Sequence, residues 1–170
     1  MKRKLVLINP VNQRRVGLTV NPSSRFPPLG LGIVAALTPS EWSIKIIDEN
    51  FEPFVYEKAD LVGLTAFTAS VLRAYEIAKI YRKQGVRTVL GGIHASLLPD
   101  EAIHYVDSVV IGEAETVWQR VISDFTHGKL QKKYQAGFSE LSGIPKPRHD
   151  LFHPGYFFAS IQTARGCPMD

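Results

Sequence analysis

Short apolar runs alternate along the first two thirds of the chain with longer segments that repeat apolar residues at helical spacing. Leu61–Leu64 is nearly unbroken in its apolar character, which is typical of a strand covered on both faces of a parallel sheet. From Val71 to Tyr81 the apolar residues recur every three or four positions opposite charged ones, and Gly85 follows. Val86–Leu90 is a second short apolar run. The block is therefore predicted to be a strand–helix–strand unit.

The same two patterns predict the other elements of the chain. Strands are predicted at Leu5–Ile8, Trp42–Asp48 and Ser108–Ile111, and helices at about Leu29–Thr38, Pro99–Tyr105 and Glu113–His127. Strands that alternate with helices in this way predict an α/β fold. The default arrangement is a flavodoxin-like (Rossmann-like) five-stranded parallel sheet in the order 2-1-3-4-5. Helices should cover both faces, and the switch point should lie between strands one and three.

The chain changes character after Gly128, where a polar stretch replaces the alternating pattern. Residues 1–128 are expected to form the α/β domain, and residues 129–155 a linker with a possible hairpin. An apolar, β-like pattern resumes at Tyr156, so residues 156–170 are expected to begin a second, truncated domain. Within the first domain, residues 11–28 form an unusually long connection, which is either a functional loop or an ordinary surface loop.

Composition and charge exclude several classes of protein. The 170 residues are 45% hydrophobic and 21% charged, which suffices for a full core. A net charge of +4 without a long Lys/Arg run does not indicate a nucleic-acid partner. No apolar run approaches the ~20 residues of a membrane span, and no signal peptide precedes the first strand. The single Cys167 cannot form an internal disulfide. We therefore expect a cytoplasmic protein without a membrane span.

Small polar residues and glycines follow two neighbouring strands of the predicted sheet. Thr65, Thr68 and Ser70 come at and after the end of one strand, and Gly91 and Gly92 end the next. Ligands of open α/β sheets bind beyond the carboxyl ends of the strands, so the two groups should face one ligand. Glycines let a bulky group approach the backbone, and hydroxyls supply donors and acceptors.

Two common ligand sites do not fit the residues after the first strand. A dinucleotide site requires G-x-G-x-x-G there, whereas the chain has Asn9-Pro10-Val11-Asn12, and Gly30 and Gly32 fall inside a predicted helix. A phosphate-receiver domain requires acidic residues after strand one and an Asp at the end of strand three. The chain has Asn9 and Thr65 at those positions, so this interpretation fails for lack of a nucleophile.

Several candidate residues admit two interpretations from the sequence. His94 follows the glycines and could contact a ligand edge or anchor a loop, while a metal role is disfavoured because no partner ligand lies at suitable spacing. Glu113 and Glu115 could complement a helix dipole or contact a ligand amide. Phe67 could form a pocket wall or belong to the core.

The end of the chain carries the most specific motif. Thr163-Ala164-Arg165-Gly166-Cys167-Pro168 reads T-x-R-G-C-P after a β-like segment. This sequence is similar to the opening strand of radical S-adenosylmethionine domains, whose C-x-x-x-C-x-x-C motif holds a [4Fe-4S] cluster. The printed chain stops one residue before the second Cys of such a motif is due. Nearly the whole chain resembles the N-terminal cobalamin-binding domain of cobalamin-dependent radical S-adenosylmethionine enzymes.

That resemblance extends to short motifs within the sheet domain. Thr65-Ala66-Phe67 takes the place of S-x-L in cobalamin-binding folds, Gly91-Gly92-Ile93-His94 matches G-G-x-H, and Gly112-Glu113 matches the start of G-E-x-E. The D-x-H-x-x-G motif, whose His ligates cobalt, is missing. The resemblance implies these cofactor-binding residues: Asn9, Asn12, Thr65, Ala66, Phe67, Thr68, Ser70, Gly91, Gly92, Ile93, His94, Gly112 and Glu113. It also implies that Cys167 ligates a cluster in a longer chain.

The function implied is that of a cobalamin-binding module in a radical enzyme that methylates an unactivated carbon. Cobalamin would bind base-off, without a protein histidine on cobalt. In the longer protein a C-terminal radical domain, a [4Fe-4S] cluster and S-adenosylmethionine would be its partners, and the fragment alone would be inactive. Two alternatives stay open: a non-catalytic interaction domain that has lost its ligand, and a carrier of flavin or another nucleotide.

Overall fold

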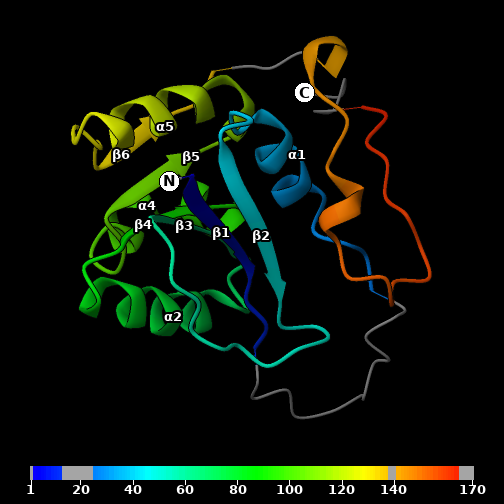
Figure 1. Cartoon of the computed structure of the whole chain (residues 1–170), viewed down its shortest axis with the longest axis horizontal. Helices are drawn as coiled ribbons and strands as arrows, with labels where there is room; N and C mark the ends of the chain where they lie inside the picture. Colours follow the sequence, from blue (N-terminus) through cyan, green and yellow to red (C-terminus); the bar gives the residue numbers. More distant parts are fainter. Residues whose placement is uncertain (1, 13–24, 138–140, 165–170) are drawn as a thin grey trace.

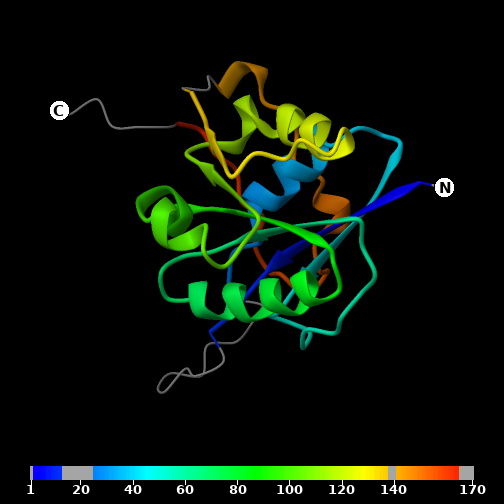
Figure 2. The same cartoon turned by 90° about the vertical axis from the view of Figure 1, so that its left-hand side faces the viewer.

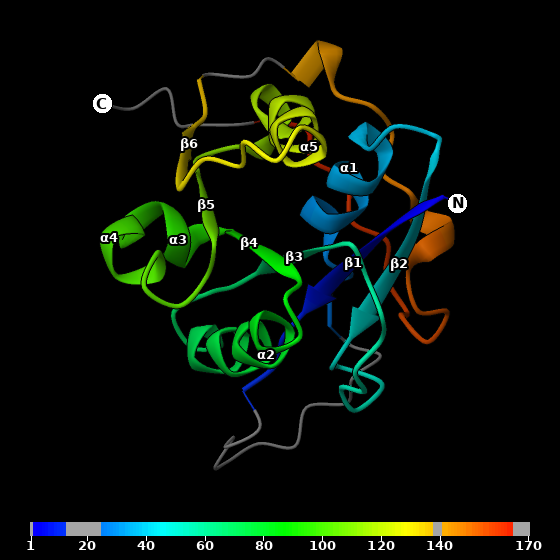
Figure 3. The same cartoon turned by 60° about the vertical axis from the view of Figure 1, so that its left-hand side comes forward.

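One parallel sheet of six strands organises the molecule. The computed structural model describes residues 2–12, 25–137 and 141–164. Figure 3 shows the strands in the order β2-β1-β3-β4-β5-β6. The strands are β1 (Arg3–Asn9), β2 (Trp42–Asp48), β3 (Leu61–Thr65), β4 (Arg87–Gly91), β5 (Ser108–Ile111) and β6 (Lys133–Gln135). The flavodoxin-like fold and the position of the switch point between β1 and β3 are confirmed, with one strand more than predicted.

The sixth strand corrects the expectation of a linker or hairpin after Gly128. Lys133–Gln135 pairs parallel to β5, from Val109 opposite Lys133 to Ile111 opposite Gln135. Its central Tyr134 is buried, and its hydroxyl donates to Asp124 across 2.8 Å. Burial, together with this hydrogen bond, raises the pKa of Tyr134 to about 12. One buried aromatic ring between polar neighbours anchors this strand to the sheet. A segment of three residues is too short to show a periodic pattern in the sequence, so the strand was not predicted.

Helices cover both faces of the sheet, as predicted. They are α1 (Leu29–Leu37), α2 (Val71–Lys83), α3 (Ile93–Leu97), α4 (Pro99–Ala102) and α5 (Trp118–Thr126), with 3₁₀ turns η2 (Ala114–Thr116), η3 (Leu141–Gly143) and η4 (His149–Leu151). α1 and α5 lie on one face, and α2, α3 and α4 on the other (Figures 1 and 2). None of the helices described is long and apolar enough to cross a membrane.

Each of the first five strands contributes to two separate cores because successive side chains point to opposite faces. In β1, Val6 and Ile8 belong to the core under α2, while Leu5 and Leu7 belong to the core under α1 and α5. All four side chains are fully buried. The double coverage explains why the strands read as continuous apolar runs.

The last helix begins later than its apolar spacing predicts. Residues 114–116 form the turn η2, whose last bond runs from the Val117 N–H to the Ala114 carbonyl across 3.0 Å, and α5 starts at Trp118. The Trp118 indole N–H donates to the Thr38 hydroxyl after α1 across 2.8 Å. The tighter turn directs this ring against α1, so Glu113 and Glu115 precede α5 rather than occupy its first turn.

Residues 145–164, which we call the return segment, run back along the outside of α1 (Figure 1). The Arg148 N–H donates to the Gly32 carbonyl across 3.0 Å. The expected β-like element from Tyr156 onward is not a strand in residues 156–164. Phe157 and Ile161 are 71% and 83% exposed there. An apolar run does not form a β-strand when no neighbouring strand is available to pair with it.

Candidate functional site

A cavity of about 550 Å³ opens at the carboxyl ends of β3, β4 and β5, on the face covered by α1. Its volume falls within the roughly 300–1,000 Å³ of small-molecule pockets. Leu7 of β1 also lines it, so it opens at the switch point where ligands of such sheets bind. The expected cofactor-binding residues that line it are Thr65, Phe67, Gly91, Gly92, Ile93, Gly112 and Glu113.

Two glycines outside the expected set line this cavity. A Cβ on Gly30, in the first turn of α1, would meet nothing within 4 Å. A Cβ on Gly63, in the middle of β3, would lie 2.7 Å from Leu7 Cδ2, so the Leu7 side chain takes the space that a side chain at Gly63 would need. The cavity is therefore open at α1 and bounded by Leu7 at the sheet.

The glycine pair at the end of β4 has two different surroundings. Gly92 adopts φ +93°, and a Cβ on it would lie 2.9 Å from both the backbone nitrogen and oxygen of Ala66. A Cβ on Gly91 would meet only Val110, at 4.0 Å. Gly92 is thus required for the approach of two loops, whereas Gly91 borders the open cavity.

The rim loop, residues 66–70 between β3 and α2, is fixed by its neighbours. Ala66 is buried, its N–H donates to the Gly91 carbonyl at 3.2 Å, and its carbonyl accepts from the His94 N–H at 3.1 Å. The Ser70 hydroxyl donates to the Phe67 carbonyl at 3.3 Å and does not cap α2. Phe67 is 63% exposed, so it forms a wall of the cavity rather than core.

His94 anchors the rim loop and does not line the cavity. It is 2% exposed. Its Nδ1 lies 3.2 Å from Thr68 Oγ1, and its Nε2 lies 3.3 Å from the Tyr75 hydroxyl and 3.4 Å from Glu101 Oε1. Of the two interpretations left open by the sequence, the structure supports the anchor.

Ser96 is a rim residue that was not among the sequence candidates. Its hydroxyl donates to the Gly92 carbonyl at 3.0 Å and accepts from the Gly112 N–H at 2.9 Å. It therefore ties the end of β4 to the end of β5. A serine four residues after a strand-ending glycine was the available signal, but it could not reveal the contact with Gly112.

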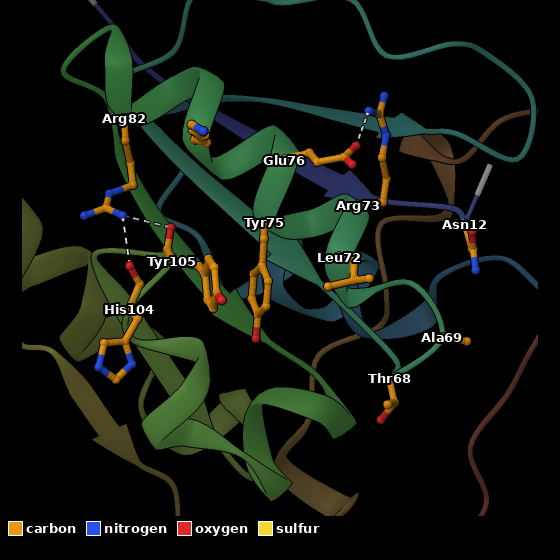
Figure 4. A pocket seen from close by; sticks show the side chains of 11 residues that line it. Asn12, Thr68, Ala69, Leu72, Arg73, Tyr75, Glu76, Arg82, His104 and Tyr105 are labelled. Carbon is orange, nitrogen blue, oxygen red and sulfur yellow. Dashed lines mark hydrogen bonds and ion pairs between the residues drawn. The ribbon is translucent and has the colours of Figure 1, made fainter. Parts of the chain in front are cut away.

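Asn9 and Asn12 lie apart from the cavity. The Asn9 amide donates to Asp48 Oδ1 across 2.9 Å, at the end of β2. Asn12 lines a second hollow of about 860 Å³ over α2, together with Thr68 (Figure 4). That hollow is bordered by charged side chains such as Arg73 and Arg82. The second hollow lacks the glycine pair and has a more polar lining, so the first cavity is the better candidate site.

Most of the α/β domain matches a known protein family. Residues 15–122, more than half of the chain, match the family model of the B12 binding domain. The chain belongs to the B12-binding domain family. The cofactor-binding resemblance expected from the motifs is thereby confirmed, and the protein is a cobalamin-binding module.

Relatives of this B12-binding domain include three enzymes named as methyltransferases or methylases. Bacteriochlorophyllide d C-8(2)-methyltransferase of Chlorobaculum tepidum is 37% identical over 84% of this chain and 34% of its own. Bacteriochlorophyllide d C-12(1)-methyltransferase of the same organism is 29% identical over 99% and 39%. Hopanoid C-2 methylase of Rhodopseudomonas palustris is 28% identical over 84% and 29%. The chain spans about a third of the length of these relatives.

The residues of this B12-binding domain fit the cofactor assigned by the family. A cobalamin tail ends in a flat heteroaromatic base, and the cavity offers largely apolar walls between a helix and a sheet, with open space beside Gly30 on the helix. Cys167, the expected cluster ligand, and residues 13–24 of the long connection lie outside the described residues.

Proposed function

We propose that the chain is the cobalamin-binding module of a longer radical S-adenosylmethionine enzyme that methylates an unactivated carbon. The cavity between α1 and β3 is the observation that carries the proposal, because it gives the cofactor tail a place within a B12-binding domain. The names of the relatives support methyl transfer. Cobalamin, when bound, supplies a cobalt centre that can carry a methyl group.

The residues of this chain would bind and orient the cofactor. The nucleotide base would enter the cavity between α1 and the sheet, beside Gly30, where a Cβ would meet nothing within 4 Å. Thr65 and Gly91 would border the tail where it leaves the cavity. Apolar walls would keep water away from the base, and the rigid strand ends would fix the corrin ring above the rim.

Cobalamin would bind base-off and without a protein histidine on cobalt. No histidine is among the residues that line the cavity in the described part of the chain. His94 is turned toward Tyr75 and Glu101 beneath the rim loop. The base cannot occupy the cavity and coordinate cobalt at once, so a tail buried between α1 and the sheet supports the base-off form.

The remainder of the proposed enzyme is a radical domain. The T-x-R-G-C-P sequence that ends in Cys167 and Pro168, and the greater length of the relatives, support it. Three thiolates would hold a [4Fe-4S] cluster and leave one iron for S-adenosylmethionine. The parent gene should encode Cys directly after Asp170 and again three residues further on. Any other residues at those two positions would remove the radical-enzyme proposal.

Titration of the purified chain with hydroxocobalamin, followed by visible spectroscopy, tests the binding mode. We expect saturable binding and the spectrum of base-off cobalamin. Gly30→Leu should lower the affinity by about tenfold or more, or about 1.4 kcal/mol, because it adds a bulky side chain at a lining position where a Cβ has open space. Gly30→Ala is the matched control and should bind nearly as well as the wild type.

Other outcomes would support the alternatives. Absence of any spectral change would indicate an interaction domain without ligand. Saturable binding of flavin mononucleotide in place of cobalamin would indicate a flavin carrier. A base-on spectrum would contradict the placement of the tail while leaving cobalamin binding intact.

A further inference from the structure

Four polar side chains form a chain of contacts beneath the rim loop. Thr68 contacts His94 Nδ1 at 3.2 Å, His94 Nε2 contacts the Tyr75 hydroxyl at 3.3 Å, and that hydroxyl contacts Glu101 at 3.1 Å. His94 and Tyr75 are 2% and 5% exposed, whereas the Glu101 side chain is 46% exposed. This row of contacts thus runs from the rim, through the core, to a carboxylate at the surface.

The number of protons available determines which group donates and which accepts in each of these contacts. The Tyr75 hydroxyl has one proton and donates it to Glu101 Oε1. Burial and the Glu101 hydrogen bond raise the pKa of Tyr75, so the hydroxyl keeps this proton. His94 Nε2 faces the tyrosine oxygen and the Glu101 carboxylate, both acceptors, so Nε2 carries a hydrogen.

In a neutral ring with its hydrogen on Nε2, Nδ1 keeps a lone pair and accepts the hydroxyl proton of Thr68. Thr68 is exposed, so its oxygen lone pairs remain available to a ligand. It lies in the rim loop next to Phe67, which lines the cavity, and it borders the hollow that Figure 4 shows beside it.

We propose that Thr68 is a ligand-binding residue fixed as a hydrogen-bond acceptor, with His94 and Tyr75 as the positioning residues that fix it. Such an acceptor selects a ligand group that donates, namely a carboxamide N–H, and disfavours a phosphate or carboxylate at the same place. Corrin rings carry carboxamide side chains around their edge. The inference therefore rests on the proposed function and adds a specificity-determining residue to it.

A purely structural role for His94 predicts something different. The His94 N–H to the Ala66 carbonyl, at 3.1 Å, already ties the rim loop to α3, and this bond does not depend on the imidazole tautomer. If the side chain only filled space, either tautomer and either direction of the Thr68 hydroxyl would serve equally. The tautomer and the ligand preference are thus the measurements that separate the two roles.

The first measurement is nitrogen NMR of the ligand-free chain with ¹⁵N-labelled histidine, and His94→Gln identifies the signal. We expect a neutral ring with the hydrogen on Nε2. A hydrogen on Nδ1, or an imidazolium, would overturn the proposal, since His94 would then donate to Thr68 and free its hydroxyl proton. This result does not depend on cobalamin binding.

The second measurement compares hydroxocobalamin with its monocarboxylic acids, in which one ring carboxamide is replaced by a carboxylate. Thr68→Val keeps the shape and removes the acceptor, and it should weaken cobalamin binding about three- to tenfold, the worth of one hydrogen bond. Thr68→Ser should retain the affinity. One carboxylate isomer should bind the wild type markedly more weakly than the others, and Thr68→Val should remove most of that difference.

The outcomes separate this inference from the proposed function. Cobalamin binding unchanged by Thr68→Val, with no isomer discriminated, would overturn the role of Thr68 and leave the module intact. No binding of cobalamin by the wild type would overturn both. Circular dichroism of the Thr68 variants checks that the fold is kept, which is expected because the side chain lies on an exposed loop.

Discussion

Gly91 and Gly92 are neighbours in sequence, but different forces require them. Gly92 combines φ +93° with ψ −179°, a backbone conformation that is accessible essentially only to glycine. It allows β4 to turn into α3 against the Ala66 backbone. Gly91 has space around it and borders the cavity. The pair thus serves the fold through one residue and the ligand through the other.

Substitution of Gly92 and Gly85, two of the four described glycines that have positive φ, separates backbone strain from steric contact. Gly92→Ala should lower the free energy of unfolding by about 3 kcal/mol, because it combines backbone strain with a contact at 2.9 Å to the Ala66 backbone. Gly85→Ala, at φ +75° with nothing within 4 Å, should lower it by only about 1–2 kcal/mol. Urea unfolding measures both. Equal losses would show that the approach to Ala66 contributes nothing.

Residues at the strand ends could be predicted from the sequence, whereas residues that form the cavity could not. Thr65 and Gly91 follow apolar runs, and parallel strands bring their carboxyl ends together. Gly63 lies inside such a run, and only the packed structure shows that Leu7 takes the space of its missing side chain at the cavity wall. Similarly, the spacing placed His94 beside the glycines but could not show that its ring turns toward the core under α2.

Between elements, an ion cluster ties the first two strands to the connection that follows them. Lys4 of β1 and Lys45 of β2 both donate to the carboxylate of Glu57, which lies between β2 and β3. Burial alone would raise the pKa of Glu57, but the hydrogen bonds from the two lysines outweigh it and lower the pKa from its ordinary value of 4.5. The ionised carboxylate is therefore favoured in the folded protein.

Stability should depend on Glu57 at neutral pH and not in acid. Because its pKa is lowered on folding, its contribution is fully present above the ordinary value of 4.5 and is lost as pH falls through the lower folded value. Glu57→Gln should lower the free energy of unfolding by about 1 kcal/mol at pH 7, since the cluster is partly exposed. At pH 3 the loss should be smaller. The exposed Glu41→Gln is the control, and a loss independent of pH would contradict the assignment.

The order of the elements was predictable because β1, β3, β4 and β5 are largely apolar runs buried on both faces, and β2, at the edge of the sheet, alternates apolar and polar residues. Two features were not. β6 depends on a single buried side chain, Tyr134, whose partner Asp124 lies on α5 and is ten residues away. The turn η2 depends on the contact between Trp118 and Thr38, which are 80 residues apart. Periodicity reports local burial and carries no information on such distant pairs.

In the molecule as a whole, the return segment is packed against the α/β domain rather than free of it. Phe152 fills the notch left by Gly32 on α1, where a Cβ would lie 2.5 Å from the Phe152 ring. Further along, the Tyr156 hydroxyl donates to buried Asp48 at the end of β2, and Ile161 reaches the cavity lining. The described end of the return segment therefore lies beside the cavity.

Alanine substitutions at two glycines of α1, Gly30 and Gly32, test whether the return segment is packed against this helix. Replacing a helical glycine by alanine normally stabilises a helix by up to about 1 kcal/mol, and Gly30→Ala, with open space around it, should approach that gain. Gly32→Ala adds the same methyl group where Phe152 lies, so the gain should be lost and the return segment released from α1. Trypsin cleavage after Arg148 should then accelerate severalfold in Gly32→Ala and not in Gly30→Ala. Equal cleavage rates in the two variants would mean that the Phe152 contact does not hold the return segment against α1. Other contacts of the return segment would then have to determine where it lies relative to the cavity.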